Sequence, residues 1–228
     1  MHNGAFCQRI HLFMPKRLET SAADYLPEKR TLPALRDASK RCKGCDLWTK
    51  GTQTVFGEGA SHAKVLFVGE QPGDKEDLSG KPFVGPAGAL LDKGLLEAGI
   101  DRKEVYVTNA VKHFNWEPRG KRRIHKKPSA MHIAACRPWL DAEIAAVKPR
   151  VIVCLGATAA QALLGKTFKV TQRRGELISS DMAPFILATV HPSSILRAPD
   201  EQSRQEEFAK FINDLREIKN VLEGKRAA

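Results

Sequence analysis

Short apolar runs alternate with longer segments of helical periodicity from about residue 31 onward. Apolar runs that are bounded by polar residues or glycine are typical of strands buried on both faces of a sheet. Four such runs occur, at residues 65–68, 105–107, 151–155 and 185–190. Because helical segments separate them, we expect an α/β fold, a three-layer α-β-α sandwich with a central four-stranded parallel sheet.

The helices between and after these strands carry recognisable end signals. Pro86 and Gly99 mark the start and the end of one helix, because proline suits the first turn and glycine the position after the last. Ser129 is in position to cap another helix that runs towards Val147, and Pro138 should kink or divide it. Further helices are predicted at residues 34–39, 158–164 and 201–222.

The chain of 228 residues, 42% of them hydrophobic, suits one globular core. We expect a single domain at residues 31–228 and an N-terminal extension, residues 1–30, that is partly mobile. Ligands of parallel sheets bind beyond the carboxyl ends of the strands. Residues 70–73, 109–125 and 191–197 follow three of the predicted strands, so we expect these segments to form a functional site.

The charge balance favours a polyanionic partner. Lys and Arg number 37 and Asp and Glu number 26, which leaves a net charge of +11. Nucleic acid is favoured over a membrane, because no stretch approaches the roughly 20 apolar residues of a spanning helix. The first ten residues lack a secretion signal, so we expect a cytoplasmic protein. In such a reducing compartment the five cysteines would not form a disulfide framework.

Two of the segments carry groups suited to chemistry on a sugar. The carboxylate of Glu70, ahead of a sharp Pro-Gly turn, can orient a water or a nucleophile, or stabilise positive charge on the sugar. His191 can donate a hydrogen bond to the oxygen of a leaving base, while Ser193 and Arg197 hold phosphate. Taken separately, the first segment could equally be a turn with a solvated glutamate and the second a helix cap with a structural histidine.

Both segments resemble the two active-site motifs of the uracil-DNA glycosylase superfamily. The match extends through Lys-Pro-Phe-Val-Gly-Pro-Ala-Gly at residues 81–88 and Thr-Asn-Ala-Val-Lys at residues 108–112. It is closest to the iron-sulfur branch and, through Lys-Arg-Arg-Ile-His at residues 121–125, to the uracil-DNA glycosylase X group. The resemblance covers nearly everything from residue 42 to residue 197. It implies the fold of this superfamily and cleavage of the N-glycosidic bond of uracil in DNA, single-stranded as well as duplex.

The resemblance also implies how the base is held. Phe83 would stack on the flipped uracil, Asn109 would read its Watson-Crick edge, and Gln71 would also contact it. The chemistry agrees, because an amide can pair with O4 and N3 of uracil and an aromatic face can hold a base outside the helix. By itself Phe83 could be a core aromatic residue, and Asn109 could be a turn residue at a strand end.

A Cys-x-x-Cys pair, Cys42 and Cys45, suits zinc, a redox dithiol or an iron-sulfur cluster. In the iron-sulfur glycosylases two further ligands come from the loop after the second strand and from the next helix. Here those positions hold His113 and Cys136. The resemblance therefore implies a [4Fe-4S] cluster with a structural role, bound by these four residues. Zinc would use the same ligands and stays open.

The loop from Lys112 to Lys127 holds seven Lys and Arg residues and one acid, Glu117. Such a loop is typical of phosphate contacts, here by Lys121, Arg122 and Arg123, although a merely solvated loop is the alternative.

By resemblance to the X group, His125 of this loop would attack C1′ of the deoxyribose as uracil leaves. The covalent bond would persist, so each protein molecule would act once. We expect the protein to be a monomer. Glu70 could take up the other proton of the imidazole. Three alternatives stay open: a multiple-turnover glycosylase in which Glu70 positions water, a non-catalytic module that binds uracil in DNA, and an iron-sulfur redox protein.

Overall fold

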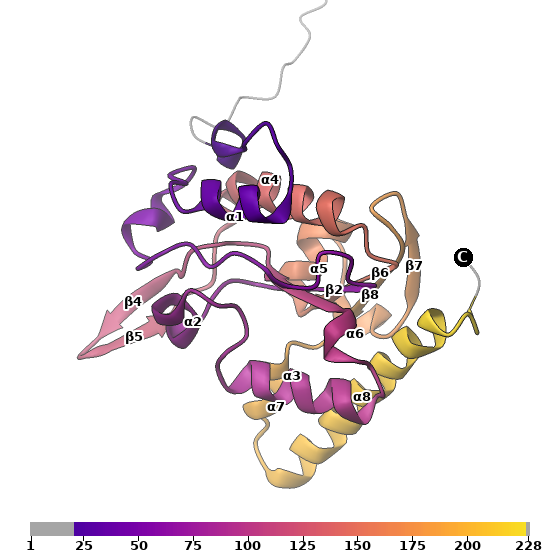
Figure 1. Ribbon diagram of the computed structural model, residues 1–228. Helices are drawn as coiled ribbons and strands as arrows, with labels where there is room; N and C mark the ends of the chain where they lie inside the picture. Colours follow the sequence, from indigo (N-terminus) through magenta and orange to yellow (C-terminus); the bar gives the residue numbers. More distant parts are fainter. Residues whose placement is uncertain (1–20, 227–228) are drawn as a thin grey trace, which may run out of the picture.

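The structure, a computed structural model, describes residues 21–226. Its centre is a six-stranded sheet with the order β1-β3-β2-β6-β8-β7. A separate two-stranded sheet, β4-β5, extends away from the body of the molecule (Figure 1). The strands are β1 (Glu58–Gly59), β2 (Val65–Gly69), β3 (Val105–Asn109), β4 (Trp116–Arg119), β5 (Arg122–His125), β6 (Val151–Leu155), β7 (Leu177–Ser180) and β8 (Ala183–Thr189).

The four strands expected from the apolar runs are adjacent in the sheet and parallel to one another, in the order β3-β2-β6-β8. This confirms the predicted parallel core. The short strand β1 and the strand β7 add an antiparallel edge on each side, which the sequence did not predict. Neither strand forms a continuous apolar run in the sequence, because β1 has only two residues and β7 is only partly buried.

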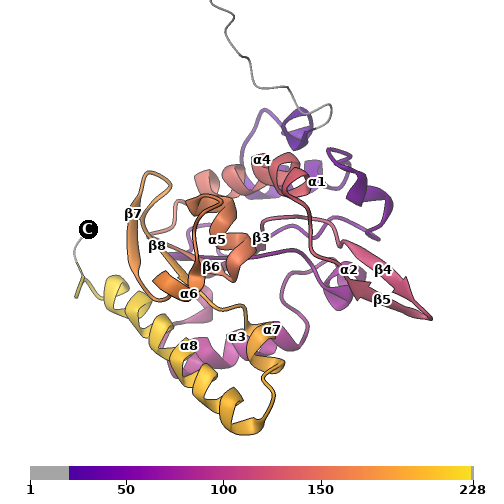
Figure 2. The ribbon, with the colours of Figure 1, turned by 180° about the vertical axis from the view of Figure 1, so that it is seen from behind.

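Helices cover both faces of the sheet, as Figures 1 and 2 show from opposite sides. Alternate strand residues point to opposite faces. Leu66 and Val68 of β2 pack in one layer with helices α1, α4 and α5, and Val65 and Phe67 pack in the other with α3, α7 and α8. The helices are α1 (Leu32–Ser39), α2 (Asp74–Ser79), α3 (Pro86–Glu97), α4 (Ala130–Val147), α5 (Ala157–Leu164), α6 (Val170–Arg173), α7 (Pro192–Leu196) and α8 (Glu201–Leu222), with short 3-10 helices η1 (Ala22–Tyr25), η2 (Asp46–Thr49) and η3 (Arg102–Glu104).

Helix α4 begins as predicted and does not divide. Ser129 Oγ accepts a hydrogen bond from the backbone N–H of His132 at 3.3 Å, and the His132 ring accepts one from Ser129 at 3.1 Å. Of the two effects expected of Pro138, a kink or a division, the division does not occur, because α4 is continuous across it. Proline removes one backbone hydrogen bond, but burial of the next two residues, Trp139 and Leu140, holds the helix against the core.

The basic loop is folded into a hairpin. Strands β4 and β5 pair antiparallel, with Trp116 opposite His125. Charged residues and a proline interrupt any alternation of apolar and polar positions, so the sequence reads as a loop.

At the N-terminal side, Ala22 of η1 is fully buried in the layer of α1 and α4. Residues 1–20, most of the extension expected to be mobile, lie outside the described residues. Within residues 21–226 no helix combines the length and the apolar character that crossing a membrane requires.

Candidate active site

A cavity of about 590 Å³ opens where the parallel strands end. Segments that follow β2, β3, β6 and β8 all contribute to its wall, as expected for a parallel sheet. Its wall contains eight of the predicted site residues: Glu70, Gln71, Phe83, Asn109, His125, His191, Ser193 and Arg197. The basic residues Lys121, Arg122 and Arg123 lie outside it, around a smaller hollow beside α2.

Glu70 stands at the end of β2 as an ionised carboxylate. Its Oε1 lies 3.3 Å from His125 Nε2 on the hairpin, and its Oε2 accepts a hydrogen bond from the Thr158 hydroxyl at the start of α5. Burial raises the pKa of the Glu70 carboxyl, but the hydrogen bonds from His125 and Thr158 and the charge of His125 act against it, and the pKa lies below its usual value. The positive charge of Lys127 acts in the same direction.

His191 is a neutral imidazole whose tautomer the backbone selects. It occupies the N-cap of α7, where Pro192 begins the helix, and its Nδ1 accepts the backbone N–H of Ser193 at 3.1 Å. Because that N–H can only donate, the ring proton resides on Nε2. Desolvation lowers the pKa of His191 to about 4, so the ring is uncharged at neutral pH. The residue thus serves as a helix cap and still offers a donor.

Two glycines allow Phe83 and Asn109 to reach the cavity. A Cβ on Gly69 would lie 2.2 Å from Asn109 Oδ1 and 2.9 Å from the Phe83 ring, and one on Gly88 would lie 1.7 Å from the Phe83 carbonyl oxygen. Phe83 adopts the left-handed backbone conformation with a φ of 57°, which a non-glycine residue takes only when its surroundings impose it. Its ring lies 6.2 Å from that of His191 with an interplanar angle of 25°.

The Gln71 side chain attaches the hairpin to the pocket. Its Nε2 donates to the carbonyl oxygens of Asn115, at 3.0 Å, and Lys126, at 3.1 Å, which flank the two strands of the hairpin. Its Oε1 accepts the backbone N–H of Asn115 at 3.3 Å. Both amide N–H groups are therefore engaged by protein, so the predicted contact of Gln71 with uracil would have to come from its backbone.

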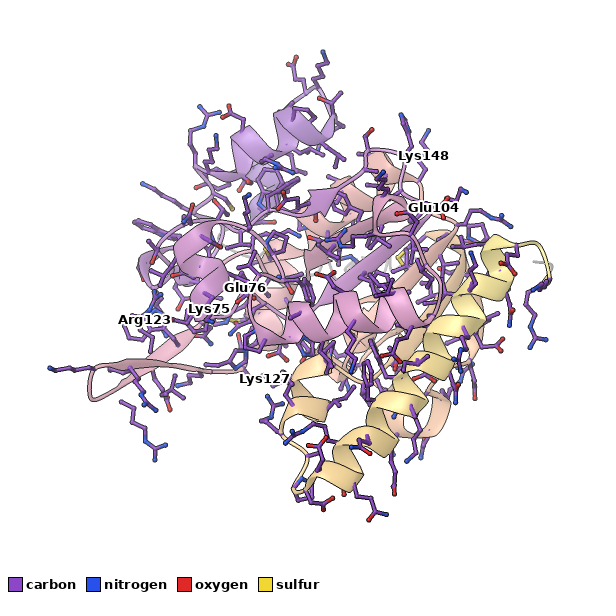
Figure 3. All side chains as sticks on the ribbon, turned by 60° about the horizontal axis from the view of Figure 1, so that its bottom comes forward. Lys75, Glu76, Glu104, Arg123, Lys127 and Lys148 are labelled. Carbon is purple, nitrogen blue, oxygen red and sulfur yellow. The ribbon has the colours of Figure 1, made fainter. Side chains whose placement is uncertain are left out.

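Arg123 attaches the same hairpin to α2. Its guanidinium forms ion pairs of 2.6 Å with Asp74 and with the fully buried Asp77, and it lies on the side of the hairpin that faces α2 (Figure 3). Asp77 also accepts hydrogen bonds from Thr52. The predicted DNA contact of Arg123 stays a prediction, whereas the neighbouring Lys121 and Arg122 are exposed and have no ion-pair partner within the described part of the chain.

Comparison with known proteins identifies the family of the chain that forms this pocket. Residues 56–216 match the model of the uracil DNA glycosylase superfamily. The chain belongs to that superfamily. It is 40% identical to the Type-4 uracil-DNA glycosylase of Thermotoga maritima over 73% of this chain and 83% of that protein. Identity is 35% to the Type-4 enzyme of Sulfurisphaera tokodaii, over 81% and 84%, and 33% to that of Saccharolobus solfataricus, over 85% and 88%.

The predicted site lacked a residue that this superfamily member holds against Glu70. Gly156, Ala157 and Thr158 are the three residues that follow β6, and all three line the cavity. The sequence segment is small and apolar, so no chemical motif draws attention to it. Its position beyond the third predicted strand was the available signal, because every parallel strand of the core sends its following loop to the same edge.

Three of the four predicted cluster ligands act on one another electrostatically. Burial raises the pKa of Cys136 to about 12, and the nearby thiols of Cys45 and Cys42 raise it as well. Sulfur atoms also accept N–H groups, from the Trp139 indole to Cys42 at 3.2 Å and from the backbone of Lys112 to Cys136 at 3.3 Å. Buried thiols of this kind become ligands only when a cation or cluster stabilises their charged form.

His113, the fourth predicted ligand, is buried, and burial lowers its pKa to about 4. The charged side chain that acts on its ring is Asp77. In residues 21–226 no three His, Cys, Asp or Glu side chains are arranged as ligands of one metal ion. Cys42, Cys45 and Cys136 thus lie near one another, while the ligand set of a metal centre stays a prediction.

Proposed function

We propose that this protein removes uracil from DNA and remains covalently attached to the sugar. The observation that carries the proposal is the convergence of Glu70, His125 and His191 in one cavity with Asn109 and Phe83. The relatives named above are Type-4 uracil-DNA glycosylases, which supports uracil as the base.

The cavity has the groups needed to select and hold the base. The side-chain amide of Asn109 pairs with O4 and N3 of uracil, and the ring of Phe83 stacks on its face. With a volume of about 590 Å³ the cavity accepts a nucleotide extruded from the strand. Burial of Asn109, which is 3% exposed, excludes water that would compete for these hydrogen bonds.

Cleavage follows from the charge states of the two groups at the strand ends. The Glu70 carboxylate stabilises the positive charge that develops at C1′ as the glycosidic bond lengthens. The neutral His191 ring donates its Nε2–H to the oxygen of uracil on which negative charge develops. Both groups hold the required state at neutral pH, because the pKa of each lies below its ordinary value.

His125 supplies the covalent step. One imidazole nitrogen forms a bond to C1′ while the bond from C1′ to N1 of uracil breaks, and the electron pair leaves with the base. The imidazole proton passes to Glu70 and balances the uracil anion. Nε2 of His125 lies 3.3 Å from Glu70 Oε1, which supports this transfer. Neutral imidazole nitrogen bound to carbon is a poor leaving group, so the adduct persists.

Replacement of the nucleophile tests the covalent step. We expect the protein to give a band with uracil-containing single-stranded DNA that survives hot denaturing detergent. His125→Ser should abolish this band, and water then gains access to C1′, so that free uracil and abasic DNA accumulate over several turnovers. Denaturing gels and release of labelled uracil measure the two outcomes.

A matched control replaces an exposed histidine outside the cavity, His62→Ser, which should leave the band unchanged. Clean abasic product without any band from the unaltered protein would instead establish a multiple-turnover glycosylase in which Glu70 activates water. An intact glycosidic bond would leave only a uracil-binding module.

DNA reaches the cavity along its basic rim. Arg197 and Ser193 line the cavity and would hold phosphates next to the extruded nucleotide, while Lys121 and Arg122 at the tip of the hairpin contact the strand beyond it. These contacts to DNA phosphates can form with single-stranded and with duplex DNA. The proposed acting unit is a monomer in the cytoplasm.

The proposal includes a structural [4Fe-4S] cluster held by Cys42, Cys45, Cys136 and His113. When bound, it would connect the segment before β1 to α4 and to the loop after β3. We expect the purified protein to contain iron and sulfide, His113→Cys to retain them and His113→Ala to lose them. Elemental analysis and the visible spectrum measure this. Cys154→Ala, which removes a thiol buried in β6, is the control and should retain the cluster. Zinc without iron would refute the cluster.

A further inference from the structure

A fully buried ion pair lies directly behind the residue that reads the base. The side chains of Lys112 and Glu143 have no exposed surface, and Lys112 Nζ lies 2.5 Å from Glu143 Oε2. We propose that Lys112 is a positioning residue that holds Asn109 in place for recognition of uracil. This proposal rests on the uracil-DNA activity proposed above, because it assigns Asn109 the task of reading the base.

The ammonium group has no donor left for any other task. Besides Glu143, Lys112 Nζ donates to Thr108 Oγ1 at 2.6 Å and to the backbone carbonyl of Asn109 at 2.8 Å. These three bonds use all three ammonium protons. Lys112 therefore bonds the last two residues of β3 from a position three and four residues further along the chain, which fixes the turn that begins at Asn109.

The peptide that follows Asn109 is held from the opposite side. The backbone N–H groups of Ala110 and Val111 donate to the carbonyl oxygens of Gly69, at 2.9 Å, and Glu70, at 3.0 Å. Asn109 Oδ1 would lie only 2.2 Å from a Cβ on Gly69, so its amide packs against bare backbone. A displacement of a few tenths of an ångström on the Lys112 side would thus alter where the amide meets the base.

Glu143 fixes the lysine to the rest of the fold. Its Oε1 accepts the backbone N–H of Gly57 at 2.9 Å and the hydroxyl of Tyr106 at 3.0 Å, and Thr108 donates to both carboxylate oxygens. The carboxylate belongs to α4 and therefore ties the turn after β3 to the helix above it. A fully bonded carboxylate cannot rotate without breaking several bonds, which gives Lys112 a rigid partner.

Stability alone does not account for such a pair. Two apolar side chains of similar volume usually stabilise a core as well as a buried ion pair or better, because neither has to lose hydration. What the pair supplies is directionality, since an ammonium ion fixes several oxygen atoms at once and an apolar side chain fixes none. The oxygen atoms that it fixes are those at the end of β3, beneath the uracil pocket.

A double replacement tests this assignment without leaving a lone buried charge. In Lys112→Met/Glu143→Gln the amide oxygen still accepts from Gly57 and Tyr106, so the variant should fold. We expect the second-order rate constant for uracil release in a single turnover to fall by about 100-fold, the loss typical of a misplaced binding group. The preference for uracil over cytosine should also decrease. Hydrogen exchange of the Ala110 and Val111 amides should become faster.

Tyr106→Phe is the matched control, since it removes one bond to Glu143 and leaves every bond of Lys112 intact. It should retain the preference for uracil and the exchange rates. Metal content is measured for each variant, because Lys112 also donates its backbone N–H to Cys136. A folded double variant with full metal content and unchanged uracil preference and exchange would overturn the proposal. If the unaltered protein releases no uracil, the proposed function fails, and the exchange rates alone decide whether Lys112 holds Asn109.

Discussion

At the scale of single residues, the site depends on two groups whose pKa values lie below their ordinary values. Glu70 keeps its charge despite burial, because His125 and Thr158 donate to it. His191 stays neutral because its ring is desolvated, with a pKa of about 4. One group can thus stabilise a cation and the other donate to an anion at the same pH. Neither pKa shift follows from residue type alone, because burial and hydrogen-bond partners set it.

These pKa values predict an acid limit for uracil release. As pH falls from neutrality, activity should stay constant until Glu70 and His191 gain protons, and should decrease there. Thr158→Val removes a donor that lowers the pKa of Glu70, so its acid limit should lie at higher pH, whereas Thr158→Ser should not move it. Single-turnover release at each pH measures this.

Circular dichroism at each pH provides the control for unfolding. The unfolded His191 has the higher pKa and binds its proton first, so acidification from about pH 6.5 towards 4 also lowers the free energy of unfolding. A Thr158→Val limit that coincides with that of the unaltered protein would contradict the role assigned to Thr158.

At the scale of elements, the β4-β5 hairpin brings its last residue, His125, to the end of β2. Gln71 holds the base of the hairpin and Arg123 holds its flank against α2. The Phe114 ring lies 6.2 Å from the imidazole. The proposed nucleophile thus depends on an element that the central sheet does not contain.

Loosening the hairpin should therefore impair capture more than release. In Arg123→Gln both ion pairs to α2 are lost, and we expect the covalent band to form at least about tenfold more slowly because His125 is less well placed. Uracil release, which relies on Glu70 and His191 and can proceed with water at C1′ when His125 is displaced, should slow less. Quenched-flow gels and labelled uracil give the two rates.

Arg122→Gln serves as the comparison, since this exposed neighbour has no contact with α2 among the described ion pairs. Equal slowing of capture and release in Arg123→Gln would show that the hairpin does not position the nucleophile separately.

At the scale of the whole molecule, the net charge of +11 would favour DNA binding mainly through basic residues that lie along the proposed path of the strand. The cavity and the hairpin occupy the edge at which the parallel strands end. Lys148, just before β6, lies far from Lys127 of the cavity wall (Figure 3). Basic residues at these two places should contribute differently to DNA affinity.

Salt dependence measures this difference. We expect Lys121→Gln/Arg122→Gln to reduce the slope of log affinity against log salt concentration by up to about 1.8 on duplex DNA, because two phosphate contacts are lost. Lys103→Gln/Lys148→Asn, which removes the same charge from the opposite edge, should leave the slope nearly unchanged. Fluorescence anisotropy with uracil-free DNA gives both slopes, and equal reductions would contradict the proposed path of the strand.

The sequence by itself determined the parallel core and half of the residues that line the pocket. Strands buried on both faces must be continuously apolar, so β2, β3, β6 and β8 were visible in the pattern. Residues such as Glu70 and His191 were found because their segments follow those strands and carry recognisable motifs. Local sequence also placed the start of α4 at Ser129, since a cap acts within one turn.

Only the tertiary structure decided which partners these residues meet. Gln71 bonds Asn115, 44 positions away, Glu70 bonds Thr158, 88 positions away, and Lys112 meets Glu143 across 31 positions. Such pairs leave no periodic pattern, because hydrogen bonds and ion pairs depend on distances that the packed layers set. For the same reason the basic loop gave no sign that it forms a hairpin, since its strands are held by Gln71 and by the acidic residues of α2.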